Sequence, residues 1–260
     1  MNKKADVVIV GTGVAGLFSA LNLPDDKEII MITKSDAESS DSFLAQGGIC
    51  VLRDEQDYDS YFEDTMRAGH YENRKESVDI MIRSSGKIIE DLVGYGVEFE
   101  KDGEAFAYTR EGAHSRPRIL FHADVTGKEI TSKLLARVRE KNNVTIYEYT
   151  TMTDILEENG KCAGITVKTK SGEESSIYAD YTILASGGIG GLYQHSTNFP
   201  HLTGDALEVA KKHHIRLEHL DYVQIHPTTL YSEKPGRRFL ISESVRGEGA
   251  LLYIKTWSVS

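Results

Sequence analysis

The stretch VVIVGTGVAG at residues 7–16 decides the fold. Its first four residues are a continuous apolar run, which is typical of a strand buried on both faces of a parallel sheet. The apolar positions of LFSALNL (17–23) have helical spacing, and Pro24 ends that helix. EIIMIT (28–33) is the next apolar run. The sequence therefore predicts a β-turn-α-β unit over residues 6–33.

The turn of this unit consists of Gly11, Thr12, Gly13, Val14, Ala15 and Gly16, which fit the pattern G-x-G-x-x-G. Gly11 permits the tight turn, Gly13 lets backbone N–H groups approach a pyrophosphate, and Gly16 lets the helix pack close to the strand. The helix N-terminus adds the positive end of its dipole. We therefore predict a dinucleotide site, and the alternative is a glycine-rich turn that serves packing alone.

Beyond residue 33 the pattern predicts a loop, then helices, then short strands. The expected elements are a loop over 35–48, helices over 58–69 and 76–93, a hairpin over 97–110, a helix over 126–141, an antiparallel meander over 144–185 and a helix over 203–214. Turns at Asn159-Gly160 and Ser171-Gly172 divide the meander. A second glycine-rich turn, SGGIGG at 186–191, follows its last strand.

The end of the second strand lacks the acidic residue that usually holds the ribose of NAD. Thr33 and Lys34 occupy that place, and Asp36 and Glu38 lie beyond it in the loop. The long excursion before the second glycine turn is unlike a simple dehydrogenase and resembles the architecture of FAD enzymes. We therefore predict FAD as the cofactor.

Composition excludes several classes of protein. The 260 residues carry 30 Lys and Arg against 40 Asp and Glu, a net charge of −10 with no basic block, which argues against a nucleic-acid partner. No apolar run approaches the roughly 20 residues of a membrane-spanning helix, so we expect no membrane partner. The two cysteines form no CxxC motif, which predicts no metal site and favours the reducing cytoplasm.

Five further motifs occur in order along the chain. They are DSFLAQGGI at 41–49, TREGAHS at 109–115 with RIL at 118–120 and ADVTG at 123–127, TGD at 203–205, QIHPT at 224–228, and SESVRGEGA at 242–250. Together they resemble the succinate dehydrogenase/fumarate reductase flavoprotein superfamily and, within it, the L-aspartate oxidases, over residues 5 to about 253. The resemblance implies an α/β, Rossmann-like FAD-binding domain with an antiparallel β-meander over 1–219, then the beginning of an α+β capping domain over 220–260.

The resemblance also implies which residues hold the FAD, and that they hold it non-covalently. The implied contacts are Thr12 to Ala15 at the pyrophosphate, Lys34 near the adenosine, Asp41, Ser42, Phe43, Leu44, Ala45, Gln46, Gly47 and Gly48 along the flavin, Thr151 and Met152 near the adenine, and Asp205 at the ribityl or pyrophosphate region. Asp41 stands where the dehydrogenase branch usually carries the histidine that bonds covalently to flavin. The flavin should therefore be dissociable.

For the substrate, the resemblance implies that Glu111 orients an ammonium group, because an amino acid needs an anionic partner that succinate does not. The alternative for Glu111 is a solvated loop charge beside Arg110. The implied ligands of the substrate carboxylates are Gln224, His226, Ser242 and Glu243. The alternative for His226 is a packing role before Pro227.

The implied reaction oxidises L-aspartate to iminoaspartate, with O2 or fumarate as electron acceptor, as the first step of quinolinate and NAD biosynthesis. Quinolinate synthase is the implied partner. The alternatives are a fumarate reductase-like or succinate dehydrogenase-like flavoprotein and an inactive FAD-binding remnant. The family's catalytic arginine has no match in this chain, and IKTWSVS at 254–260 departs from the family pattern. We therefore expect a C-terminally truncated chain that does not turn over aspartate by itself.

Overall fold

The structure, a computed structural model, describes residues 2–226, 228–242, 245, 249–251 and 253. The chain divides into two compact units. The first comprises residues 2–44 and 130–240, and the second comprises residues 45–129 with the described residues after 240. The domain boundary expected between residues 219 and 220 stays a prediction.

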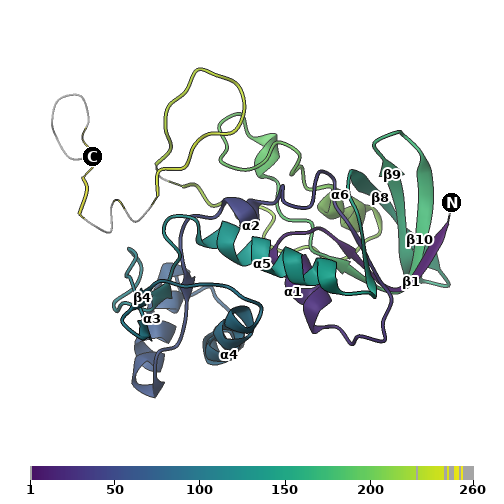
Figure 1. The fold of residues 1–260 in the computed structure, drawn as a ribbon. Coiled ribbons are helices and arrows are strands. Elements are labelled where there is room, and N and C mark those ends of the chain that lie inside the picture. The colour runs from purple at the N-terminus through teal and green to yellow at the C-terminus, as the bar shows by residue number, and fades with distance from the viewer. Residues whose placement is uncertain (1, 227, 243–244, 246–248, 252, 254–260) are drawn as a thin grey trace. The chain divides into compact units, whose positions relative to one another are not determined.

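A six-stranded sheet forms the centre of the first unit, in the order β7-β2-β1-β10-β9-β8 (Figure 1). Its strands are β1 (Lys3–Val10), β2 (Ile29–Ile32), β7 (Val144–Tyr147), β8 (Thr150–Glu158), β9 (Lys161–Thr169) and β10 (Glu174–Leu184). β1 pairs in parallel with β2 on one side and with β10 on the other. α1 (Val14–Asn22) connects β1 to β2, so the predicted β-turn-α-β unit is confirmed.

The other helices that belong wholly or mainly to the first unit are partly as predicted. They are α2 (Asp41–Leu44), α5 (Thr126–Glu140), the 3-10 helix η2 (Gly190–Leu192) and α6 (Asp205–Lys212). The loop expected over 35–48 is interrupted by the single turn α2. Ser40 precedes it, and the Ser40 Oγ accepts a hydrogen bond from Phe43 N at 3.3 Å, as an N-cap serine does. A helix of one turn is too short to produce a hydrophobic period in the sequence.

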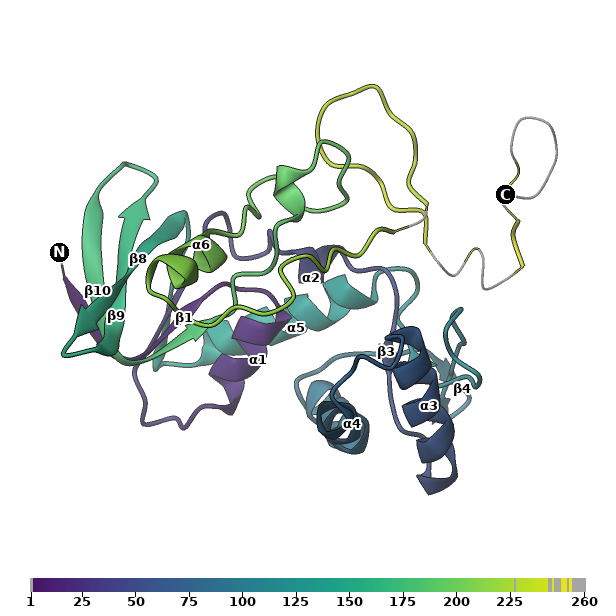
Figure 2. The same cartoon turned by 180° about the vertical axis from the view of Figure 1, so that it is seen from behind.

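The antiparallel meander begins one strand later than the sequence predicts. β7 pairs in parallel with β2, with Val144 opposite Ile29 and Tyr147 opposite Ile32. β8, β9 and β10 form the antiparallel ribbon, which Figure 2 shows from behind. The prediction that VTIYEY belongs to the ribbon was therefore wrong. A short β-branched run suits either pairing direction, and the free edge of the buried strand β2 decides between them.

The two predicted turns of the ribbon are confirmed. Asn159 and Gly160 join β8 to β9 with φ angles of 52° and 73°, the left-handed pair that a two-residue hairpin turn requires. Gly172, with a φ of 87°, lies in the turn between β9 and β10, and its N–H donates to Thr169 O at 2.9 Å. Both turns therefore use the residues that tolerate a positive φ.

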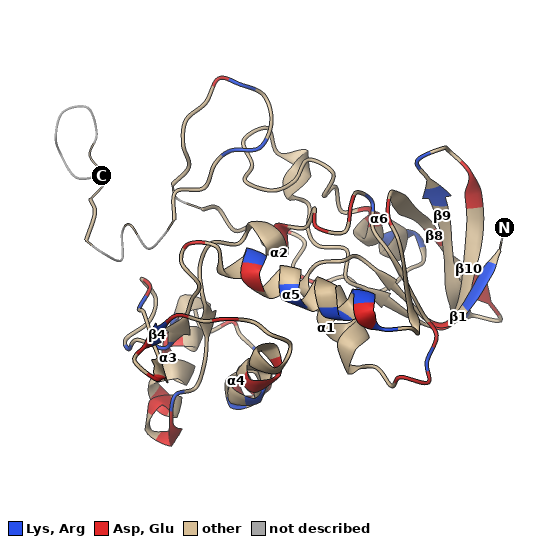
Figure 3. Cartoon of the chain, viewed as in Figure 1, with Lys and Arg blue, Asp and Glu red and all other residues tan. Residues whose placement is uncertain are grey.

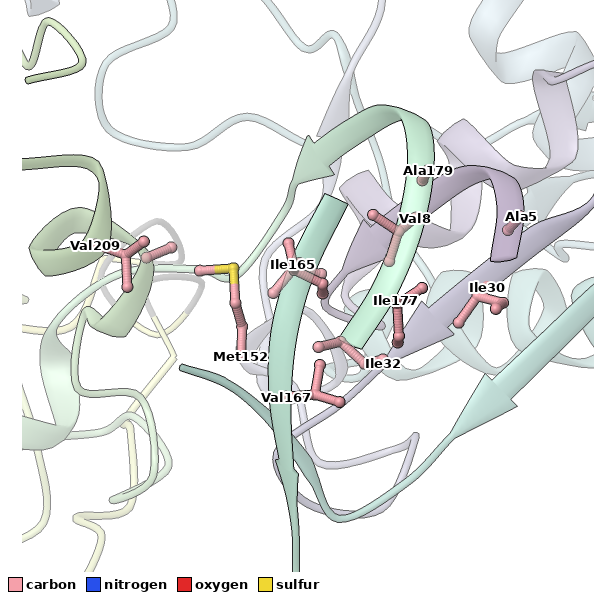
Figure 4. Close-up of a cluster of buried hydrophobic side chains, with 12 residues drawn as sticks. Ala5, Val8, Ile30, Ile32, Met152, Ile165, Val167, Ile177, Ala179 and Val209 are labelled. Carbon is pink, nitrogen blue, oxygen red and sulfur yellow. The ribbon is translucent and has the colours of Figure 1, made fainter. Parts of the chain in front are cut away.

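The central strands are buried on both faces. On one face, Val209 of α6 packs near Met152 of β8 (Figure 4). The buried cluster there contains Ala5, Val8, Val10, Ile30, Ile32, Met152, Ile165, Val167, Ile177, Ala179, Ala206 and Val209. On the other face, the Cβ position of Gly16 in α1 lies 3.4 Å from Ile9 Cγ2. The two-sided burial explains why the β1 sequence is continuously apolar.

The second unit combines helices with short strand pairs. Its elements are β3 (Ile49–Cys50) paired with β6 (Ile119–Leu120), β4 (Lys101–Asp102) paired with β5 (Ala105–Phe106), the 3-10 helix η1 (Glu55–Asp57), α3 (Tyr58–Ala68) and α4 (Lys75–Gly94). The predicted helices are confirmed, and the predicted hairpin is confirmed around its turn, over residues 101–106, whereas Thr109 pairs with Ile119. Charges of both signs are mixed along α4 (Figure 3), where Asp79 pairs with Arg83 and Asp91 with Lys87. In the part of the chain that the structure describes, no helix is long and apolar enough to cross a membrane.

A charged cluster joins β8 to α6 and predicts acid sensitivity. Asp154 Oδ1 lies 2.6 Å from His213 Nε2, and Asp154 Oδ2 pairs with the Lys212 ammonium. The hydrogen bond from Lys212, with that from His213, lowers the pKa of Asp154 to about 2. A carboxylate with a lowered pKa stabilises the fold above its unfolded pKa of about 3.9, and this contribution is lost as the pH falls through about 2.

Asp154→Asn should therefore lower the melting temperature near neutral pH, and its deficit relative to the wild type should shrink below a pH of about 4. Thermal unfolding followed by circular dichroism across this range measures the deficit. Asp180→Asn, which changes an exposed carboxylate on β10, is the matched control. A deficit that stays constant with pH would show that the ionised Asp154 contributes nothing.

Candidate functional site

Two glycine turns meet at the ends of β1 and β10. Ala185 N donates to Val10 O at 2.9 Å, which continues the pairing of these strands into the turns. Gly11 has a φ of 115°, and a Cβ there would lie 2.2 Å from Ala185 O. A Cβ on Gly16 would lie 2.1 Å from Gly11 O. Glycine at both positions is therefore required by close backbone contact, as predicted for the packing of the helix.

The N-terminus of α1 faces the segment around α2. Gly13 is the N-cap in an extended conformation and gives no side-chain cap. The Val14 N–H instead donates to Ser42 Oγ at 3.1 Å. A helix N-terminus without an acidic residue in its first turn leaves the positive end of the dipole for an anion. This geometry suits a phosphate group beside Gly13 and Ser42.

A cavity opens beside the first glycine turn. Its lining comes from β1, β2, β8, the second glycine turn and the start of α6: Val10, Gly11, Ile32, Thr33, Lys34, Thr150, Thr151, Met152, Ser186, His201, Leu202, Thr203, Gly204, Asp205 and Ala206. Four residues that the resemblance predicts to contact FAD therefore lie in one cavity: Lys34, Thr151 and Met152 at the adenosine, and Asp205 at the ribityl or pyrophosphate region. Their contacts with the cofactor stay predictions.

Three polar side chains form a network in this cavity. Lys34 Nζ donates to Asp205 Oδ2 at 2.6 Å and to Thr203 Oγ1 at 2.7 Å, and the Thr203 hydroxyl donates to Asp205 Oδ1 at 2.6 Å. Burial acts to raise the pKa of Asp205, but the hydrogen bonds from Lys34 and Thr203 outweigh it, so its pKa lies below the usual range. The cavity thus holds an ionised carboxylate, a ready acceptor for sugar hydroxyl groups.

Other cavity residues were missed by the sequence reasoning. Ser186 and Thr203 lie inside recognised motifs, so their position beside a glycine turn and before TGD could have identified them. His201 has no such signal. It lines the cavity, its ring stacks on Phe199 with centroids 5.3 Å apart, and its Nε2 lies 3.0 Å from Ser39 O. Only the fold brings residue 201 to residue 39.

The AQGG segment lies in the second unit and has two different glycines. A Cβ on Gly48 would lie 2.3 Å from Leu120 O, so the pairing of β3 with β6 accounts for that glycine. A Cβ on Gly47 would lie 3.3 Å from Glu111 Oε1. The structure thus brings the carboxylate of Glu111, which is predicted to bind the substrate ammonium, close to this loop. Gln46 Oε1 is buried and has no hydrogen-bond partner among the described residues.

The segment that carries Glu111 is held in place by contacts with the buried cation Arg118 and its carboxylate partners. Asp64 Oδ2 accepts from both Ser115 N and Ser115 Oγ at 2.7 Å. The Arg118 guanidinium, fully buried, donates to Asp64 at 2.7 Å and to Asp57 at 2.8 and 3.0 Å. Burial acts to raise the pKa of Asp57, but the hydrogen bonds from Arg118 and Ser60 hold it below its usual range. These contacts fix residues 115–118 and therefore the base of the Glu111 segment.

The predicted carboxylate ligands are less well placed by the structure. Gln224 is exposed, and His226 Nδ1 lies 3.2 Å from Thr228 N within the same loop. Ser242 is half-buried and lies in the second unit, and its carbonyl accepts from Val245 N at 3.2 Å. Glu243 lies outside the described residues. The roles of these residues in substrate binding stay predictions.

The polar groups of the first unit fit FAD. The α1 N-terminus suits the pyrophosphate, and the Asp205 carboxylate suits hydroxyl groups. Taken by itself, the second unit holds a buried acceptor, Gln46 Oε1, without a hydrogen-bond partner among the described residues, and an isoalloxazine ring has an N–H group that could donate to it. Among the described residues, no group of three or more His, Cys, Asp or Glu side chains is arranged to hold a metal ion.

Comparison with known proteins gives the same assignment. Residues 6–256 match the FAD binding domain family. The chain is 47% identical to an L-aspartate oxidase of Clostridium perfringens over 97% of the chain and 57% of that protein, and 44% identical to one of Clostridium acetobutylicum over 97% and 58%. A solved structure of a variant of E. coli quinol fumarate reductase superposes with a TM-score of 0.90 and 26% identity, covering 99% of this chain and 44% of that chain.

The similarity to the two clostridial proteins covers only part of their length. The chain spans 57% and 58% of their lengths, and the matched part contains both glycine turns, the AQGG loop and the Glu111 segment. The family match likewise includes the cavity and the second unit through residue 129. The chain therefore belongs to the FAD binding domain family, and FAD is its cofactor.

Proposed function

We propose that this chain provides the FAD-binding part of an L-aspartate oxidase, which converts L-aspartate to iminoaspartate with O2 or fumarate as electron acceptor. The observation that carries the proposal is the Glu111 carboxylate, which lies 3.3 Å from the Cβ position of Gly47 in the AQGG loop. The proposal is supported by the names of the relatives that are 47% and 44% identical to the chain. The proposed location is the cytoplasm, and the proposed consumer of the imine is a quinolinate synthase.

Each polar residue has a proposed role in binding and orientation. FAD, when bound, supplies a two-electron acceptor for the hydrogen on the substrate Cα. Glu111 pairs with the substrate ammonium, and Gln224, His226, Ser242 and Glu243 hold the substrate carboxylates. Fixing three charged groups of one small molecule leaves its Cα–H with a single orientation, which is catalysis by positioning. The non-covalent attachment of FAD is part of the same proposal, since Asp41 cannot form the histidyl bond.

The test is a titration of the FAD-loaded chain with L-aspartate and with succinate, followed by the visible difference spectrum of the flavin under anaerobic conditions. Glu111→Gln keeps the size of the side chain and removes its charge. Because a charge-assisted hydrogen bond contributes about 1.5–3 kcal/mol, the apparent Kd for L-aspartate should rise roughly 10- to 100-fold, while that for succinate should stay unchanged.

Glu104→Gln is the matched control, because Glu104 is an exposed carboxylate of the same unit, in the turn between β4 and β5. It should leave both titrations unchanged. Equal responses to L-aspartate and succinate in the wild type, unaffected by Glu111→Gln, would support a fumarate reductase-like flavoprotein. That alternative is favoured by the TM-score of 0.90 with the fumarate reductase structure. FAD binding without a response to any dicarboxylate would support an inactive remnant.

A further inference from the structure

The segment containing α2 lies between the two glycine turns of the first unit. Its Ser42 hydroxyl accepts the Val14 N–H at the start of α1, as described above. The neighbouring Asp41 points its carboxylate to the chain after the second glycine turn. Asp41 Oδ1 accepts from Phe199 N at 3.0 Å, and Asp41 Oδ2 accepts from Asn198 Nδ2. Both oxygens of the carboxylate are therefore engaged by protein groups.

Asn198 is itself held in place. The Ser196 hydroxyl donates to Asn198 Oδ1 at 3.1 Å, and Ser196 Oγ accepts from Asn198 N at 3.1 Å. A Cβ on Gly190 would lie 2.0 Å from Asn198 Oδ1, so the amide lies directly against the second glycine turn. The amide NH2 that faces Asp41 therefore has a fixed position and orientation.

We propose that Asp41 and Asn198 form a clasp that positions the α2 segment for FAD, and that Asp41 acts as a positioning residue and not as a direct ligand of the flavin. The proposal rests on FAD as the cofactor and does not depend on the identity of the substrate. Without the clasp, residues 41–44 would be free to move away from the second glycine turn, and binding would have to include the cost of ordering them.

The clasp controls the FAD site through Ser42. Ser42 Oγ lies 3.1 Å from the Cβ position of Gly13, the residue where a pyrophosphate would approach the helix. Because Asp41 and Ser42 are adjacent, a fixed Asp41 sets where the Ser42 hydroxyl stands relative to the first N–H groups of α1. The clasp thus links the second glycine turn, through two adjacent residues, to the anion site at the first.

A charge-swap series tests this inference. In Asn198→Asp two carboxylates face each other, and in Asp41→Asn one of the two acceptors is replaced by an NH2 group. In the double variant Asp41→Asn/Asn198→Asp, the amide at position 41 accepts from Phe199 N with its oxygen and donates with its NH2 group to the carboxylate at position 198. The double variant therefore restores both hydrogen bonds of the clasp. The bond between positions 41 and 198 has its donor and acceptor exchanged, and the bond from Phe199 N keeps its direction.

The measurement is the Kd of FAD, from quenching of flavin fluorescence as the apoprotein is added, together with the melting temperature of each apoprotein. Asp41→Ala and Asn198→Asp should each weaken FAD binding about 10-fold or more. The double variant should recover to within about 3-fold of the wild type. Glu38→Ala, an exposed carboxylate of the same loop, is the control and should bind FAD like the wild type.

A purely structural role would lower the melting temperature of each single variant and leave the Kd of FAD at the wild-type value below that temperature. The inference is overturned if Asp41→Ala binds FAD as tightly as the wild type. It is also overturned if the double variant binds FAD no more tightly than Asn198→Asp. If the wild-type chain itself binds no FAD, both the clasp and the cofactor assignment are overturned. If the chain binds FAD but its flavin spectrum does not respond to L-aspartate, only the proposed function is overturned, and the clasp is not.

Discussion

Arg118→Met is expected to destabilise the chain by about 3–5 kcal/mol, because it removes the only fully buried cation that the described residues place beside the buried carboxylates of Asp57 and Asp64. The Arg118 guanidinium is 0% exposed, and Asp57 and Asp64 are 1% and 3% exposed. The guanidinium also lies 3.0 Å from His114 Nδ1 and 4.9 Å from the centre of the Tyr61 ring. Methionine replaces much of the volume but none of these interactions. Urea unfolding followed by circular dichroism measures the loss.

Arg67→Met is the matched control for this prediction. Arg67 pairs with the same Asp64 at 2.6 Å, but its side chain is 55% exposed, so its loss should cost about 0–1 kcal/mol. The pKa of Asp64 is lowered in the folded chain, against the effect of its burial, by hydrogen bonds from Ser115 and Arg118. Such a carboxylate stabilises the fold above its unfolded pKa and ceases to do so as the pH falls. The deficit of Arg118→Met should therefore shrink in acid, and equal deficits for the two arginine variants would contradict the argument.

Gly11→Ala is expected to abolish measurable FAD binding, with a loss of affinity of roughly 100-fold or more, and to destabilise the first unit by about 3 kcal/mol. The φ of 115° is rarely adopted by a residue with a side chain, and the added Cβ would lie 2.2 Å from Ala185 O. The backbone can relieve this contact only by separating the two glycine turns. FAD titration and thermal unfolding of the same variant measure both effects.

Gly172→Ala separates backbone strain from the contact between the turns. Gly172 also has a positive φ, of 87°, but a Cβ there would meet no atom within 4 Å. This variant should lose about 1 kcal/mol of stability and keep the FAD affinity of the wild type. If Gly11→Ala behaved in the same way, the close approach of the two glycine turns would have no part in cofactor binding.

The sequence predicted the parts of the fold that depend on neighbouring residues. The run at 7–10, the glycine pattern and the next run at 28–33 are local signals, and β1, α1 and β2 follow them. The direction of β7 could not be predicted, because parallel or antiparallel pairing depends on which strand edge is free. α2 could not be predicted either, since a single turn between polar residues has no period.

Some residues of the candidate site could also be predicted from local sequence, and others could not. Gly11 and Gly16 could be predicted as positions of close backbone contact, whereas the resemblance gave Gly48 a place along the flavin and the structure shows it packed against Leu120. Lys34 and Asp205 could be placed in one site only through the resemblance to a family, because they are far apart in the sequence. Asn198 belongs to no recognised motif, and its contact with Asp41 follows from the fold alone.

The position of β1 in the sheet has a consequence for synthesis on the ribosome. β1 lies between β2 and β10, and Lys3 at its start pairs with Ile177. The first strand of this sheet to be made therefore waits for the last one, and its backbone N–H and C=O groups stay unpaired along one edge while the intervening residues are made. Such an edge is a template for aggregation, so the nascent chain should depend on chaperones until β10 has emerged.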